Sequence, residues 1–173
     1  MLMKFRSLPQ TVAAACLLAG CTAGTEPVID TACTTGSIAS ACTQLGEMYY
    51  KGDKIAADMS KAARYYERGC DLGDDTACNN LAVMHVTGAG GQGGVRQDFT
   101  RAQEFFRRAC NVDNAMACRN LAGLYEAGRG VDMDYDLARE YYGKACTLGD
   151  ASGCKKRESV GSDLHAAPAA GGI

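Results

Sequence analysis

Residues 70–78 read Cys-Asp-Leu-Gly-Asp-Asp-Thr-Ala-Cys, and a comparable stretch of two cysteines around a short turn occurs four times in the chain. The cysteines within a pair are 9, 8, 8 and 8 residues apart, and the second cysteines follow one another at steps of 36, 40 and 36 residues. A short fixed gap on a longer period indicates one supersecondary unit, repeated, with a cross-link in each copy. The pairs are Cys33/Cys42, Cys70/Cys78, Cys110/Cys118 and Cys146/Cys154.

Apolar residues recur at the helical period from the residue before the second cysteine of each pair onward, as in Ala77, Leu81 and Met84. We therefore expect a first helix in each unit, called helix A. A glycine, which is typical of the position just past a helix C-terminus, follows each of these stretches. These glycines are Gly52, Gly88 and Gly128.

A second helix, called helix B, is expected after the next loop. It follows an aspartate that can cap its N-terminus, at Asp58, Asp98 or Asp134. An alanine, two adjacent aromatic residues and the first cysteine of the next pair come after it. We expect the aromatic residues in the core, and the cysteines on the last turn of helix B and the first turn of the following helix A.

The first twenty residues have the features of an export signal. Lys4 and Arg6 form a short positive region, residues 11–18 are apolar, and small residues precede Cys21. The order Leu-Ala-Gly-Cys resembles the lipobox of bacterial lipoproteins, and an ordinary secretory cleavage site is the alternative.

The lipobox resemblance implies cleavage before Cys21 and acylation of that cysteine. Two or three acyl chains would anchor the chain stably. By the sorting rule of such lipoproteins, Thr22 in place of an aspartate favours the outer membrane, facing the periplasm. The apolar run is too short for a transmembrane helix.

The charge of the chain argues against nucleic acid as a partner. Loss of Lys4 and Arg6 with the leader would change the formal charge from −2 to −4. A mildly acidic chain without a basic block lacks the electrostatic footprint of nucleic-acid binding.

Eight cysteines remain once Cys16 leaves with the leader and Cys21 is acylated. In an exported chain this even number indicates disulfides in an oxidising compartment. Bridges within the close pairs compete with bridges across the long gaps. A tight helix–turn–helix can bring residues eight apart to the Cα separation of roughly 4.4–6.8 Å that a bridge requires. We therefore expect the four close pairs.

The recurring motifs resemble those of the Sel-one-like repeat (SLR) family, which is related to the tetratricopeptide repeats. The signals are Leu-(Gly/Ala)-x-(Met/Leu)-Tyr in helix A, Gly-x-Gly after it, and Ala-x-x before two aromatic residues in helix B. The turn Ala-Cys-x-x-Gly-Asp-x-x-Ala-Cys further resembles the cysteine-rich Hcp-type branch. We expect an all-α solenoid of tetratricopeptide-like helix hairpins stapled by disulfides.

The resemblance covers residues 33–158. We expect a leader over 1–20, a lipidated linker over 21–32, the SLR solenoid over 33–158 and a disordered tail over 159–173. The first unit lacks most of its helix B, the second has four extra loop residues, and the last ends after a partial helix A. Irregular terminal units are typical of capping repeats.

No metal or cofactor site is expected. The glycine-rich residues 88–93 fit a dinucleotide pattern, but they follow a predicted helix and no βαβ unit surrounds them. The cysteines of a pair are too far apart for the usual zinc spacing, and the chain has only His85 and His165. The aspartates before helix B lack a loop of calcium-ligand spacing.

Ser152 and Lys155 match the Ser-x-x-Lys of serine β-lactamases, and Hcp-type relatives are described as penicillin-binding. That chemistry also needs a base and an oxyanion site. The chain has no Ser-Asp-Asn, with Ser162-Asp163-Leu164 the nearest match, and no Lys-Thr-Gly. A β-lactam-binding or weakly hydrolysing protein is therefore the alternative of a different class.

The candidate partner-binding surface is the face of helix A opposite its core positions. In tetratricopeptide relatives this helix lines the concave face and holds extended peptides; an ordinary solvated face is the alternative.

We expect a non-catalytic envelope lipoprotein that binds a protein or peptide, with an immunity lipoprotein against a secreted toxin as a variant of that function. The residues predicted on this face are Thr43, Glu47, Tyr50, Asn79, Val83, Val86, Arg119, Glu126 and Lys155.

The predicted lipid anchor depends on the thiol of Cys21. Replacing it, Cys21→Ala, should move the protein from the detergent-soluble membrane fraction to the soluble periplasm, or leave the leader uncut, because no sulfur is left to acylate. Membrane fractionation and intact mass measure this. An unchanged mass and an unchanged membrane fraction would contradict the lipoprotein assignment.

Overall fold

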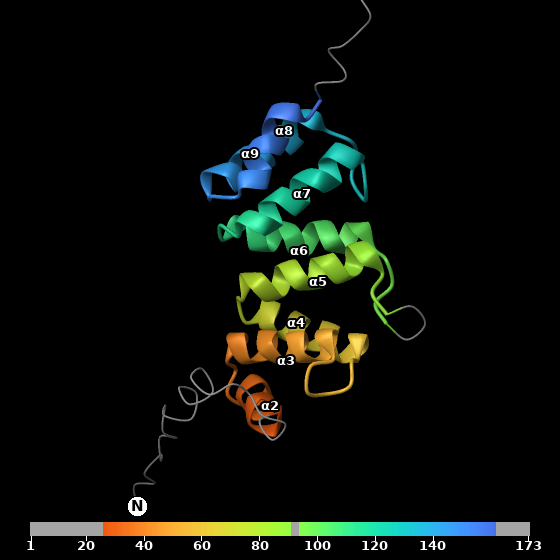
Figure 1. Ribbon diagram of the computed structural model, residues 1–173, viewed down its shortest axis with the longest axis vertical. Coiled ribbons are helices and arrows are strands. Elements are labelled where there is room, and N and C mark those ends of the chain that lie inside the picture. Colours follow the sequence, from red (N-terminus) through yellow and green to blue (C-terminus); the bar gives the residue numbers. More distant parts are fainter. Residues whose placement is uncertain (1–25, 91–93, 162–173) are drawn as a thin grey trace, which may run out of the picture.

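The computed structural model describes residues 26–90 and 94–161 as a stack of helices. Figure 1 shows the helices piled along one long axis, with α2 at one end and α8 and α9 at the other. This confirms the predicted all-α solenoid. The described helices are α2 (Glu26–Thr34), α3 (Ala39–Lys51), α4 (Met59–Asp71), α5 (Asp75–Thr87), α6 (Phe99–Asn111), α7 (Ala115–Ala127), α8 (Tyr135–Thr147) and α9 (Ala151–Ser159).

Helix A corresponds to α3, α5, α7 and α9, and helix B to α4, α6 and α8. The predicted caps are confirmed at both ends of the hairpin. Asp58 accepts a hydrogen bond from the backbone N–H of Lys61 at 2.9 Å, and Asp98 and Asp134 do the same for α6 and α8. Gly52, at φ 69°, ends α3 in the left-handed region, which glycine adopts without strain.

The packed array extends beyond both predicted limits. Helix α2 lies partly inside the expected linker, and its Ile29 and Cys33 are buried against α3. At the other end Val160 is buried, and its carbonyl accepts a hydrogen bond from Arg139. The leader, Cys21 and the rest of the predicted tail lie outside the described residues.

Small and aromatic side chains pack helix A against helix B in the core. Ala62, Ala102 and Ala138 are fully buried, as expected of residues that let helices approach closely. One aromatic residue of each helix B pair stacks on a ring of helix A, with centroids 5.6–5.8 Å apart. These stacked pairs are Tyr49/Tyr65, His85/Phe105 and Tyr125/Tyr141.

The four predicted disulfides are present, with Cα atoms 4.5–4.8 Å apart. Each joins the end of one helix to the start of the next, and in the chain-entropy model a ring of about nine residues stabilises the fold by about 2.5 kcal/mol. Four disulfides indicate an oxidising, extracytoplasmic environment. Within the described ranges, no helix combines the length and apolar character needed to span a bilayer.

A basic residue two positions before the first cysteine of a pair forms a hydrogen bond from each helix B to the preceding unit. Arg68 donates to the carbonyl of Cys33 at 3.2 Å, Arg108 to that of Cys70 at 3.0 Å, and Lys144 to that of Cys110 at 2.7 Å. These side chains thus hydrogen-bond carbonyls at the C-terminal end of the helix two places earlier in the chain, where a positive charge is favoured. Sequence analysis did not identify them, although their period matches that of the cysteines.

Candidate functional site

A hollow of about 250 Å³ lies on the helix A face between the first two complete hairpins. It contains three of the predicted partner-binding residues, Glu47, Tyr50 and Val83, brought together from α3 and α5. The full lining is Glu47, Tyr50, Lys51, Tyr66, Asn80 and Val83. We call this hollow the α3–α5 groove.

The floor of the α3–α5 groove depends on a glycine. A Cβ atom added at Gly46 would lie 2.5 Å from Cδ1 of Tyr66, so only glycine lets this ring pack against α3. Burial raises the pKa of Tyr66 well above its ordinary value of 10, and the nearby Glu47 carboxylate adds to the effect. The hydroxyl therefore stays protonated at neutral pH.

The walls of the groove offer apolar contact beside hydrogen-bonding groups. Tyr50 is 38% exposed, and Val83 is half-buried next to it in the groove lining. Lys51 and Glu47 form an ion pair at 3.1 Å, with both side chains open to solvent. An aromatic residue, an aliphatic residue and polar groups in one concave site are typical of peptide and protein recognition.

Three predicted binding residues form hydrogen bonds between neighbouring units. Thr43 donates to Oδ2 of Asp74 at 2.7 Å, and Arg119 donates to Oδ2 of Asp150 at 2.9 Å. Asn79 accepts from the amide of Asn120 at 3.1 Å. Thr43 and Asn79 are only 7% and 5% exposed. The exposure expected of Thr43 and Asn79 is therefore wrong, because both face the next helix A, whereas the Arg119 side chain stays 34% exposed.

Glu126, another predicted partner-binding residue, also has contacts within the chain. Its carboxylate accepts a hydrogen bond from the Tyr142 hydroxyl at 2.6 Å and pairs with Lys156 at 3.2 Å. Burial raises the pKa of Tyr142 well above 10, and the hydrogen bond to Glu126 and its charge raise it further. The phenol therefore remains a donor that holds Glu126 in place.

The last two predicted residues lie apart from the α3–α5 groove. Val86 is half-buried and packs against the main core, while Lys155 is exposed on α9 at the far end of the array. Sequence analysis missed Lys51, Asn80 and Tyr66 as groove residues. Tyr66 was assigned wholly to the core, although one edge of its ring lines the hollow.

The described residues of the other sequence motifs are not arranged for the chemistry that those motifs suggest. Ser152 and Lys155 are both exposed on α9, and within residues 26–90 and 94–161 no hydrogen bond joins them. Part of the glycine-rich stretch 88–93, together with Ser162, Asp163 and His165, lies outside the described residues. The described part of the chain holds no group of three or more His, Cys, Asp or Glu side chains placed to bind a metal ion.

Comparison with known proteins identifies the repeat. A family model described as Sel1 repeat matches residues 39–74, 75–114 and 115–150, which together make up more than half of the chain. No curated protein matches the sequence.

Solved structures share the architecture. A Sel1 repeat protein from Oxalobacter formigenes is 26% identical with a TM-score of 0.63, covering 69% of this chain and 47% of that protein. The protective antigen c5321 of uropathogenic Escherichia coli, which displays an SLR fold, is 25% identical with a TM-score of 0.68, covering 74% and 26%. Helicobacter pylori cysteine-rich protein B is 23% identical with a TM-score of 0.57, covering 75% and 95%. The chain thus spans less than half of the first two proteins.

The placement of Arg119 predicts a role in stability. Arg119→Gln should lower the free energy of unfolding by about 1 kcal/mol at pH 7, since it removes a charge-assisted hydrogen bond between α7 and the start of α9. Burial alone would raise the pKa of Asp150, but hydrogen bonds from Gly153 and Arg119 lower it below its ordinary 3.8. This contribution is therefore present above about pH 4 and lost as the pH falls through the folded pKa.

Denaturant unfolding of both proteins at pH 7 and at pH 2–3 measures the effect. The difference between wild type and Arg119→Gln should shrink at the acidic pH. Arg107→Gln is the matched control, because Arg107 is exposed and forms no ion pair with another described residue. Equal effects of the two substitutions at pH 7 would contradict the role assigned to Arg119.

Proposed function

Because the chain belongs to the Sel1 repeat family, whose members are helical repeat scaffolds that commonly mediate protein interactions, we propose that it binds a protein or peptide partner through the α3–α5 groove. The observation that carries this proposal is the convergence of Glu47, Tyr50 and Val83 around one hollow. Tyrosine is among the residues that most often dominate binding energy at interfaces.

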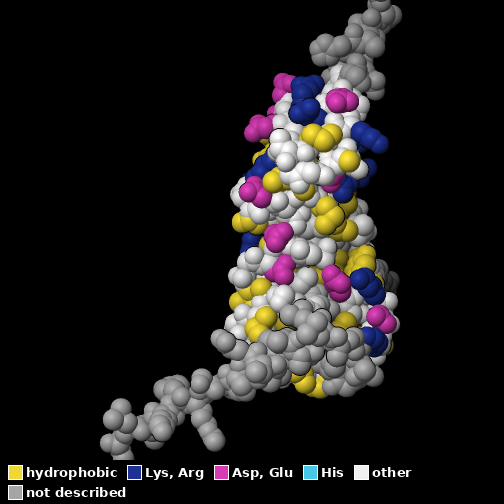
Figure 2. Space-filling model, turned by 60° about the vertical axis from the view of Figure 1, so that its left-hand side comes forward, with side chains coloured by type: hydrophobic (Ala, Val, Ile, Leu, Met, Phe, Trp, Pro, Cys, Tyr) yellow, Lys and Arg dark blue, Asp and Glu magenta, His cyan; other side chains and the backbone are white. Residues whose placement is uncertain are grey.

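The distribution of side chains on the surface favours binding of a partner in a groove rather than on a broad apolar patch. On the face seen in Figure 2, hydrophobic side chains are scattered among charged ones and do not gather into one large area. Scattered apolar residues are ordinary on a soluble surface. A concave site with a protonated phenol, an amide and an ion pair at its edges can instead bind an extended segment by its side chains and backbone.

The proposed setting is the bacterial envelope. The leader pattern and Cys21 favour a lipid-anchored protein at the outer membrane, with the array facing the periplasm. The four disulfides support an oxidising compartment. An immunity lipoprotein that captures a secreted toxin is one form that such a binding protein could take.

A photo-crosslinking amino acid at position 50 tests the groove directly. In cells, a variant carrying it at Tyr50 should form a covalent adduct with the partner, because this side chain is 38% exposed at the groove edge. The matched control carries the same group at Val112, which is 63% exposed on a turn away from the groove. Adducts are detected by mass spectrometry of the purified protein.

Once the partner is known, its affinity for each purified variant completes the test. Tyr50→Ala should weaken binding by about tenfold or more, the loss expected for a hot-spot residue. Val112→Ala should leave the affinity and the helicity unchanged. Crosslinking only from position 112, or equal affinities of wild type and Tyr50→Ala, would rule out the α3–α5 groove as the binding site.

A further inference from the structure

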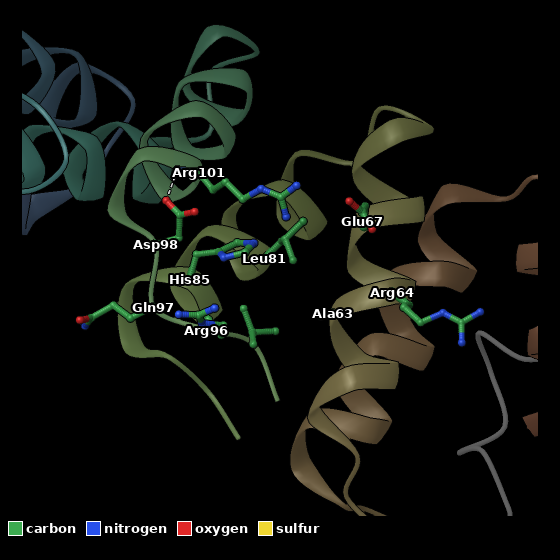
Figure 3. Close-up of a pocket in the computed structure, with 10 residues that line it drawn as sticks. Ala63, Arg64, Glu67, Leu81, His85, Arg96, Gln97, Asp98 and Arg101 are labelled. Carbon is green, nitrogen blue, oxygen red and sulfur yellow. Dashed lines mark hydrogen bonds between the residues drawn. The ribbon is translucent and has the colours of Figure 1, made fainter. Parts of the chain in front are cut away.

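A second, larger cavity of about 520 Å³ lies between α4 and α6, beside the loop that carries the four extra residues (Figure 3). It shares no lining residue with the α3–α5 groove. We call it the His85 cavity. Its lining is Ala63, Arg64, Glu67, Leu81, His85, Val95, Arg96, Gln97, Asp98 and Arg101.

The cavity exists because two side chains are shorter here than one unit later. Counted from the cysteines, His85 and Ala63 occupy the positions of Tyr125 and Gln103 in the next unit. There the Gln103 amide donates to the Tyr125 hydroxyl at 3.1 Å, so that the pair bridges α6 and α7. A histidine and an alanine cannot form this bridge, and the space beside them stays open.

The charges around the cavity also differ from the next unit. Arg96 and Arg101 correspond by position to Asp132 and Leu137. Figure 3 shows Arg96 beside His85 and Arg101 extending toward Glu67 on α4, while the Arg64 side chain extends away from His85 in this view. Neither Arg96 nor Arg101 forms an ion pair within the described part of the chain.

Two acidic residues, Asp98 and Glu67, also line the cavity. Asp98 accepts a hydrogen bond from the backbone N–H of Arg101 at 3.0 Å, where it serves as the cap of α6. Glu67 lines the cavity and forms no ion pair with either arginine within the described ranges. With Arg64, which also lines the cavity, the lining holds three arginines against two carboxylates, a formal excess of one positive charge that favours an anionic ligand.

His85 adds a hydrogen-bonding group that no described residue uses. The side chain is only 7% exposed, and its buried Nδ1 has no hydrogen-bond partner among the described residues. Buried polar groups in proteins are almost always hydrogen-bonded. Burial lowers the pKa of His85 below 6.5, so the ring is neutral at pH 7 and can form one further hydrogen bond with a ligand.

The remaining walls are apolar, formed by Ala63, Leu81 and Val95. The volume lies within the range of roughly 300–1,000 Å³ that is usual for small-molecule sites. We propose that the His85 cavity binds a carboxylate with an apolar body, its charge on Arg96 and Arg101, a polar atom on His85, and its apolar part against Ala63 and Leu81. Such a group is found on a free carboxylic acid and on the C-terminal residue of a peptide.

Titration of the isotope-labelled mature protein, followed by NMR, tests this site with three probes. N-acetyl-leucine carries both the charge and the apolar body, N-acetyl-leucinamide lacks the charge, and acetate lacks the body. We expect saturable shifts around His85 with N-acetyl-leucine, and clearly weaker binding of the other two. Acetyl-Ala-Ala-Leu distinguishes the sources: tighter binding indicates a peptide C-terminus, and weaker binding indicates a free acid.

Substitutions inside and outside the cavity lining show where the ligand binds. Arg101→Gln should weaken N-acetyl-leucine binding about tenfold, the loss expected for one charge-assisted contact. Arg107→Gln, on the same helix but outside the cavity lining, is the control and should leave the affinity unchanged. His85→Tyr should abolish binding by filling the cavity, with the fold retained, since tyrosine occupies this position in the flanking units. If His85→Tyr fails to fold, Ala63→Gln is the second variant, since it fills the cavity from the α4 side.

Three results would each overturn the proposal. They are the absence of saturable shifts with N-acetyl-leucine and acetyl-Ala-Ala-Leu, equal binding of acid and amide, or unchanged binding in folded His85→Tyr and Arg101→Gln. Tyr50→Ala should not affect this binding, so the two proposed sites can fail separately.

Discussion

The covalent link at each turn is the constraint on which the rest of the array depends. By holding the ends of two helices at a Cα separation of 4.5–4.8 Å, each bridge fixes where a helix B ends and the next helix A begins. That register places the cap of helix A and lets Arg68, Arg108 and Lys144 reach a half-cystine carbonyl one unit back. A hairpin of two 13-residue helices buries little core by itself, so these local links and the neighbouring unit stabilise it together.

Features encoded within one unit could be predicted from the sequence. The apolar period, the aspartate caps, the closing glycines and the cysteine pairing each depend on residues a few positions apart, and the structure has all of them. Helix α2 was predicted only as a remnant of a helix B, because it is short and lacks the aromatic pair of the other B helices. Its burial depends on Ile29 and Cys33 packing against α3, which no local pattern reveals.

The candidate site was predicted only in part, because the period of a single helix distinguishes its core side from the opposite side and nothing more. Tyr50 and Glu47 lie where that side meets solvent. Thr43, Asn79 and Arg119 share the same side but are turned toward the next helix A by the way the units stack. The His85 cavity forms because His85 and Ala63 are shorter than the residues at the same positions of the next unit. Only a position-by-position comparison of the units would have predicted it. In both hollows, the candidate chemistry comes from residues that vary between units, on helices α3 to α8 that all have the same length.

Mapping the disulfides by mass spectrometry, on an unreduced digest of the mature protein, tests the central constraint most directly. The account predicts peptides joined as Cys33–Cys42, Cys70–Cys78, Cys110–Cys118 and Cys146–Cys154, with none of these eight thiols free to react. Bridges across the long intervals, such as Cys42–Cys70, or freely titrating thiols at these positions, would contradict the register on which the array and both hollows depend.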